Sequence, residues 1–170
     1  MKNHIDIMDY ANQINKALPR GILLTTAAEG RVNTMTIGWG HLGIEWGRPI
    51  FVAYVRESRY TTEMLKKNGE FTVNVPLDSV DPKILKVCGT VSGRDTDKLA
   101  QLGLTREEGE AVSVPAIREL PLTLECRVVF SAKQDAAQLP QEIRDKYYPN
   151  GHYDNHVAYY GQVVGAYIVK

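Results

Sequence analysis

The 170-residue chain has no net charge and no long apolar run, and each absence excludes a class of protein. Twenty basic and twenty acidic residues cancel, so no overall field attracts nucleic acid or an anionic membrane, and we expect neither partner. Any bound anion must therefore be held by local groups. No apolar run approaches the length of a transmembrane helix, and residues 1–9 lack the apolar core of a signal peptide. We therefore expect a cytoplasmic protein.

Cysteine is also scarce. The two cysteines, Cys88 and Cys126, form no metal-binding or redox spacing, which is typical of a protein from a reducing compartment. The simplest interpretation of Cys88 is a small apolar residue packed at a helix end. No neighbouring base or cation motif predicts a depressed thiol pKa. The sequence therefore predicts no catalytic nucleophile.

The pattern of apolar residues predicts one mainly β domain over residues 1–170, with enough length to bury a sizeable core. Short strands separated by glycine and proline are rarely followed by a full crossover helix, which argues against a doubly wound parallel sheet. They favour a small β-barrel with short helices inserted between strands. The predicted strands are 21–26, 31–37, 50–55, 70–75, 122–130 and 156–169, and the predicted helices are 9–18, 63–68, 83–87, 95–102 and 140–147.

The clearest candidate site lies between strand 50–55 and helix 63–68. This short stretch carries two guanidinium groups and several hydroxyls to the start of a helix. The first amides of a helix lack internal partners and its dipole favours an anion, while arginine offers a planar fork to phosphate oxygens. The alternative is that Ser58 is an ordinary N-cap and the arginines are solvated. The predicted phosphate-binding residues are Arg56, Ser58, Arg59, Tyr60 and Thr61.

A second polar loop, Ser92 to Lys98, is by local chemistry a turn into a capped helix. Its two cations, Arg94 and Lys98, stand close to a hydroxyl flanked by glycine, which suits an anion as well. The phosphate pattern at residues 56–61 favours that second interpretation.

Two other motifs are rejected. Residues Gly38 to Gly43 match the dinucleotide-binding pattern G-x-G-x-x-G, but that pattern functions only where it opens a helix inside a βαβ unit. Gly47 and Pro49 follow too soon for a helix, so we expect these glycines to shape turns between strands. His152 and His156 have a metal-like spacing, but they lie on a loop and a strand with no third nitrogen or sulfur ligand close in sequence. We therefore predict no metal site.

Five segments, in order and with similar spacing, resemble the flavin reductase-like family of FMN-binding split barrels, which includes flavoredoxin. The resemblance covers about residues 15–168 and implies a six-stranded antiparallel split barrel, usually dimeric, with FMN near the subunit interface. The matching segments are Asn33-Thr-Met-Thr-Ile-Gly-Trp39, Val55-Arg-Glu-Ser-Arg-Tyr-Thr61, Phe71-Thr-Val-Asn-Val-Pro76, Cys88-Gly89 and Ser92-Gly-Arg-Asp-Thr-Asp-Lys98.

The resemblance implies a role for each segment. The first segment would line the isoalloxazine ring, the second would hold the phosphate, the third and fourth would border the ring or ribityl chain, and the fifth would close the phosphate end. The implied cofactor-binding residues are Asn33, Thr34, Met35, Thr36, Arg56, Ser58, Arg59, Tyr60, Thr61, Asn74, Val75, Pro76, Cys88, Gly89, Ser92, Gly93 and Lys98; the substrate-side candidates are Trp39, His152 and Tyr153.

Two of these assignments have equally simple structural alternatives. Residues 33–36 fit an alternating strand with Met35 in the core. Asn74 is either on a solvated face or buried with a polar partner, and only the resemblance favours a ligand-facing position.

The resemblance implies an FMN-binding oxidoreductase that takes electrons from NAD(P)H or a protein donor and passes them to an acceptor. Bound flavin supplies the chemistry, so no acid, base or nucleophile is required. The motifs resemble the flavoredoxin branch, which favours protein-bound FMN. The alternatives are a flavin-storage protein without turnover, and a barrel that binds another phosphate ligand such as pyridoxal phosphate. We expect a homodimer.

Overall fold

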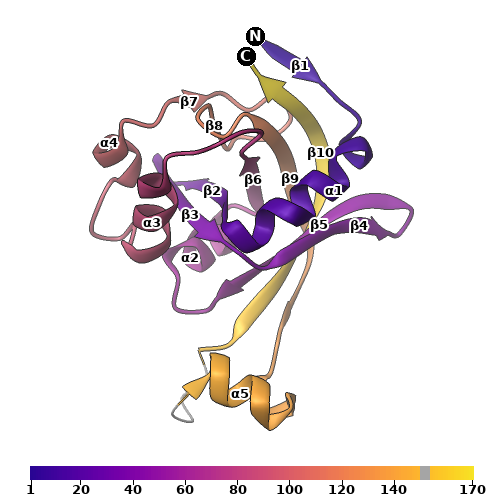
Figure 1. Ribbon diagram of the computed structural model, residues 1–170, viewed down its shortest axis with the longest axis vertical. Coiled ribbons are helices and arrows are strands. Elements are labelled where there is room, and N and C mark those ends of the chain that lie inside the picture. Colours follow the sequence, from indigo (N-terminus) through magenta and orange to yellow (C-terminus); the bar gives the residue numbers. More distant parts are fainter. Residues whose placement is uncertain (150–153) are drawn as a thin grey trace.

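The computed structural model of the protein describes residues 1–149 and 154–170. It confirms a mainly β fold with short helices (Figure 1). Seven strands follow one another in one antiparallel sheet in the order β3-β2-β6-β9-β10-β5-β4, and β1 pairs with β10 as an eighth strand. The strands of this sheet are β1 (Lys2–His4), β2 (Ile22–Ala28), β3 (Arg31–Ile37), β4 (Gly40–Glu45), β5 (Arg48–Arg56), β6 (Glu70–Val75), β9 (Leu122–Lys133) and β10 (His156–Val169).

All five predicted helices are present within a few residues of their expected positions. Three 3₁₀ turns accompany them, two of which flank α1. The helices are α1 (Ala11–Ala17), α2 (Tyr60–Lys67), α3 (Pro82–Thr90), α4 (Lys98–Leu102) and α5 (Gln141–Tyr147), and the 3₁₀ turns are η1 (Ile7–Tyr10), η2 (Leu18–Arg20) and η3 (Ala136–Gln138).

The prediction of six strands was too low, because two short strands join the sheet. One is β1. The other is β4, which lies in the glycine-rich segment that we expected to form turns. Gly40 lies inside β4, where it faces β5 so closely that a Cβ atom would lie 2.6 Å from the carbonyl oxygen of Val52. Gly47 does form a turn, with a φ of +67°. A separate small antiparallel pair is formed by β7 (Arg106–Glu107) and β8 (Ala116–Ile117).

The main core lies inside the curved sheet and is covered by α1, whose Ile14 is fully buried. The long strand β10 runs past both β9 and β5, and its register against β9 shifts at Gly161 and before Gly165. At Gly161 a Cβ atom would lie 2.4 Å from the ring of Phe71. Glycine therefore lets the backbone of β10 pass directly over the core at this bulge.

A second apolar cluster attaches α3 and α4 to the outside of the sheet. Its buried members include Leu23 of β2, Ile84 of α3 and Leu99 of α4. Figure 1 shows these two helices on one side of the molecule, beside β3 and α2, and α5 at the far end of the β9–β10 pair. This packing brings the start of α2, the end of α3 and the start of α4 together at β3.

Within the described parts of the chain, no helix combines the length and the apolar character needed to cross a membrane.

Candidate functional site

A cavity of about 220 Å³ opens where α2, α3 and α4 meet β3. A second cavity of about 190 Å³ adjoins it and shares Met35, Arg56 and Arg59. Together they approach the size of ordinary small-molecule sites. The residues that line the first cavity are Asn33, Met35, Arg56, Ser58, Arg59, Tyr60, Thr61, Cys88, Thr90, Val91, Ser92, Gly93, Arg94, Lys98 and Asp154.

Lys98 brings a buried cation to the first cavity. It is the first residue of α4, which Asp97 caps by accepting a hydrogen bond from the amide of Ala100. Only 3% of Lys98 is exposed, and its ammonium donates one long hydrogen bond of 3.4 Å to the carbonyl of Cys88. No ion pair among the described residues includes it. Burial lowers the pKa of Lys98, because a desolvated ammonium without a counter-ion is unfavourable.

Arg59 adds a second cation to the same cavity. It holds the N-cap position of α2, but its side chain makes no capping hydrogen bond, and no hydrogen bond or ion pair between described residues uses its guanidinium. Its positive charge also disfavours the charged form of Lys98. Two neighbouring cations without a carboxylate partner provide a place where an anionic ligand would be stabilised.

Asn33 supplies a buried acceptor. Its amide nitrogen donates to the hydroxyl of Thr61 at 3.1 Å, while its Oδ1 atom has no hydrogen-bond partner among the described residues. Only 3% of the residue is exposed. A Cβ atom on Gly93 would lie 2.0 Å from this oxygen, so glycine is required there. A buried acceptor without a donor is costly, and a ligand N–H or O–H group in the cavity would satisfy it.

Tyr60 lines the first cavity and contacts two arginines through its ring. The guanidinium carbons of Arg31 and Arg94 are 5.2 and 5.6 Å from its ring centre. Arg94 also pairs with Glu63 and donates to the carbonyl of Ser58 at 3.1 Å. These contacts fasten the 92–94 turn to the start of α2, so the cavity wall is fixed by packing and charge rather than by the loop alone.

Arg56 also makes structural hydrogen bonds. Its two terminal nitrogens donate to the carbonyls of Tyr147 and Asp154 at 2.9 and 3.0 Å. The guanidinium therefore ties the end of α5 and the start of β10 to β5. It still lines both cavities, but two of its five N–H donors are used by backbone oxygens. Arg56 therefore has a structural role in addition to the predicted phosphate contact, which stays a prediction.

Ser58 is not the N-cap of α2, because Arg59 occupies that position. Its amide and hydroxyl instead donate to the carboxylate of Asp154, at 3.0 and 2.5 Å.

The second cavity has an aromatic wall. Trp39 lies 4.8 Å from the ring of His156 and 5.1 Å from that of Tyr147, measured between ring centres. His156 is hydrogen-bonded through Nδ1 to the hydroxyl of Tyr148 at 2.6 Å. Burial, assisted by the neighbouring Arg56, lowers the pKa of His156 to about 4. Its imidazole is therefore neutral near pH 7, and this wall presents flat, uncharged surfaces to a ligand.

Cys88 lines the first cavity but is 1% exposed, and burial raises the pKa of its thiol. A raised pKa opposes formation of the thiolate that a nucleophile requires. The structural interpretation of Cys88 is therefore favoured.

The structure brings most predicted site residues together, with a few exceptions. Asn74 is fully buried on β6, and its amide donates to the carbonyls of Ile117 and Leu120 and to the hydroxyl of Thr123. It holds the loop before β9 and lies outside both cavities. Val75 is part of the main core, and Pro76 lines a different groove beside α1. The third segment is therefore structural in this fold.

Three further predicted residues make structural contacts, and only Thr36 among them lines a cavity. Thr34 is buried and bonds Thr25 of the neighbouring strand. Thr36 lines the second cavity while its hydroxyl donates to the carbonyl of Leu85. Gly89 lies next to Thr36, and a Cβ atom on the glycine would make an ordinary van der Waals contact of 3.5 Å with the Cβ of Thr36. His152 and Tyr153 lie outside the described residues.

Three residues that line the cavities were not predicted as site residues from the sequence. Asp154 lines the first cavity, and Tyr54 and His156 line the second. The pairing of β10 with β5 places His156 opposite Arg56, so Asp154 lies near Ser58. Only this strand register would have revealed the contact. Among residues 1–149 and 154–170, no cluster of three or more potential ligands could hold a metal ion.

The fold and the cavities define a small antiparallel β-barrel protein whose cations and buried acceptor suit an anionic, hydrogen-bonding ligand. The family model of the flavin reductase like domain matches residues 15–170. The chain therefore belongs to the flavin reductase-like family, a family of flavin-related oxidoreductases.

The chain is also similar to individual known proteins. An uncharacterized protein of Archaeoglobus fulgidus is 32% identical over 121 residues, which cover 71% of this chain and 67% of the relative. Flavoredoxin from Methanosarcina acetivorans is 27% identical with a TM-score of 0.66, covering 88% of this chain and 68% of the other. An FMN-binding domain of a flavin reductases-like enzyme from Shewanella baltica has a TM-score of 0.69 at 17% identity, covering 99% and 77%, and supports the fold alone. The chain spans about two thirds of the length of the first two proteins.

Proposed function

We propose that the protein binds FMN in the two adjoining cavities and acts as a flavin-dependent oxidoreductase. The observation that carries the proposal is the pair of cations, buried Lys98 and half-buried Arg59, that line one cavity and form no ion pair with a carboxylate among the described residues. A phosphate monoester would supply the missing negative charge. The orphan Oδ1 atom of Asn33 would accept a hydrogen bond from a ligand N–H or O–H group.

The residues present fit such a ligand. Arg59, Lys98 and the first amides of α2 would hold the phosphate, while Met35 lies where the two cavities meet and offers a flexible, polarizable surface to a ring. Bound flavin would supply hydride and electron transfer. The chain itself would bind and orient the ring, exclude water and keep the neutral His156 beside it.

We propose that Trp39 and His156 form the substrate side of the site, where NAD(P)H or a redox protein would deliver electrons. Their flat, uncharged rings would suit a nicotinamide or another planar donor. Arg56 and Arg59 border the same cavity and would favour a donor that carries negative charge.

The test is anaerobic stopped-flow absorbance of the FMN-loaded protein mixed with NADH, and separately with NADPH. We expect rapid bleaching of the flavin band with at least one of them. If dithionite bleaches the flavin but neither nucleotide does, the protein is not a nicotinamide-dependent reductase. It would then be an electron carrier that depends on a protein donor, or a flavin-storage protein. A purified protein that retains no FMN when loaded would contradict the flavin assignment itself.

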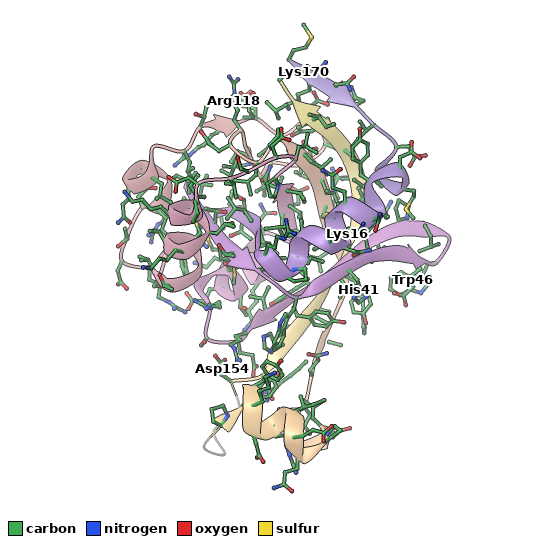
Figure 2. The ribbon with its side chains drawn as sticks, viewed as in Figure 1. Lys16, His41, Trp46, Arg118, Asp154 and Lys170 are labelled. Atoms are coloured by element: carbon green, nitrogen blue, oxygen red, sulfur yellow. The ribbon has the colours of Figure 1, made fainter. Side chains whose placement is uncertain are left out.

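We also propose a homodimer, supported by an exposed aromatic face at the β4–β5 turn and on β9 and β10. Trp46 is 58% and Phe130 49% exposed, and their ring centres are 6.5 Å apart; Tyr160 lies 5.2 Å from Phe130. Figure 2 shows Trp46 at the tip of the β4–β5 hairpin. Exposed apolar clusters of this kind mark interaction sites in many soluble proteins.

Light scattering coupled to size-exclusion chromatography measures this directly. We expect a mass twice that of the 19.0 kDa chain, and conversion to the monomer mass in Phe130→Glu. A monomeric wild-type protein would exclude the homodimer, and an unchanged dimer in the variant would place the interface elsewhere.

A further inference from the structure

The carboxylate of Asp154 accepts hydrogen bonds from Ser58, a residue that we expected to bind the phosphate of a ligand. One oxygen accepts the amide of Ser58 at 3.0 Å and the other accepts its hydroxyl at 2.5 Å. Asp154 lines the same cavity as Arg59 and Lys98. A carboxylate that accepts from an amide and a hydroxyl makes the contacts that two phosphate oxygens would make at this position.

The fold holds Asp154 there through several independent contacts. Its carbonyl accepts a hydrogen bond from Arg56. The next residue, Asn155, accepts the amide of Glu57 through its carbonyl at 2.9 Å and that of Ala136 through its side chain at 3.0 Å. His156 then pairs with Arg56 at the start of β10. Strand register therefore sets the position of the carboxylate, and Figure 2 shows Asp154 where β10 begins, between the barrel and α5.

The carboxylate does not form an ion pair with either cavity cation. The ion pairs of the described residues include neither Asp154 nor Lys98 nor Arg59. Asp154 thus uses neutral donors of the site and leaves the cations available. A phosphate bound by those cations would lie in the same cavity as the carboxylate, and like charges at short range repel.

We propose that Asp154 is a specificity-determining residue that competes with the ligand phosphate for Ser58 and so limits the affinity for phosphorylated flavin. The proposal rests on the proposed function. If Asp154 competes with the phosphate, removal of its negative charge strengthens the binding of FMN. The binding of riboflavin, which has no phosphate, stays unchanged. A residue that merely orients Ser58 for the ligand would have the opposite effect, because its loss would weaken FMN binding.

The test is Asp154→Asn, which keeps the shape of the side chain and one acceptor oxygen but removes the charge. Flavin-stripped wild-type and variant proteins are titrated into FMN and into riboflavin, with flavin fluorescence as the readout. We expect the Kd for FMN to fall by about tenfold and the Kd for riboflavin to stay within about twofold of wild type. Asp145→Asn is the matched control: it removes the same charge from an exposed position on α5 and changes neither Kd.

A second variant identifies the group through which Asp154 acts. In a Ser58→Ala background, Asp154→Asn gains less FMN affinity than in the wild type, because the contested hydroxyl is already gone. Thermal unfolding of each variant without ligand confirms that it is folded.

The outcomes separate the proposal from the function on which it rests. If the wild type binds FMN and the variant binds it equally or more weakly, the competition is wrong and the flavin site stands. If FMN and riboflavin gain affinity by the same factor, the effect is not directed at the phosphate and the proposal is overturned. If neither protein binds FMN, the proposed function is wrong and the competition falls with it.

Discussion

Lys98→Met is expected to lower the affinity for FMN by between about tenfold and 100-fold, the range for the loss of a charge-assisted hydrogen bond. Methionine keeps a flexible chain of similar length and removes only the ammonium. The effect is large because Lys98 is 3% exposed and its charge has no carboxylate partner among the described residues. Titration of flavin fluorescence measures the change in Kd.

The same substitution is expected to raise the melting temperature of the flavin-free protein. A buried ammonium that donates one 3.4 Å hydrogen bond is costly to desolvate, and its removal relieves that cost. Lower ligand affinity together with higher intrinsic stability is a combination that a purely structural lysine does not produce. Lys86→Met, on the exposed side of α3, is the control and should change neither quantity. A destabilised variant with unchanged FMN affinity would show that Lys98 serves the fold.

Gly93→Ala is expected to weaken FMN binding at least tenfold, by displacing Asn33 rather than by removing a charge. The new methyl group would lie 2.0 Å from Oδ1 and 2.7 Å from Cγ of Asn33, so the amide must rotate. Rotation breaks the hydrogen bond to Thr61 and moves the free acceptor away from the ligand position. The loss of the acceptor and the loss of its preorganised position each weaken the binding free energy of FMN by on the order of 1 kcal/mol. Isothermal titration calorimetry with FMN measures the total loss of binding free energy.

Gly43→Ala is the matched control for this glycine. A Cβ atom at Gly43 meets nothing within 4 Å, so the same methyl group is accommodated on β4 without a shift. We expect wild-type FMN affinity from it. If Gly93→Ala also binds FMN like the wild type, then Asn33 takes no part in the site, and the alternative of an ordinary strand residue is correct.

Local patterns predicted most of the fold, because they depend on near neighbours in the chain. The predicted strands 31–37 and 70–75 coincide with β3 and β6, and the predicted helix 83–87 lies within α3. The strand β4 was missed because glycine is usually depleted in strands, and the reason for Gly40 is its close approach to β5. That approach exists only after the hairpin has formed.

The candidate site was predicted where one segment carries its own chemistry and missed where two distant segments meet. The cations Arg59 and Lys98 stand out by residue type. Asp154 did not, because its partner Ser58 is 96 residues away and only the β5–β10 register brings them together. Arg56 and Asn74 were assigned to the ligand because the sequence could not show that their side chains donate hydrogen bonds to backbone carbonyls of distant segments.

Comparison of FMN and riboflavin binding by the flavin-stripped wild-type protein tests most directly whether a phosphate, held by Lys98 and Arg59, anchors the flavin. We therefore predict that FMN binds at least tenfold more tightly than riboflavin and that added salt reduces the difference. Equal Kd values for the two flavins, at low and high salt alike, would show that the phosphate does not anchor the flavin.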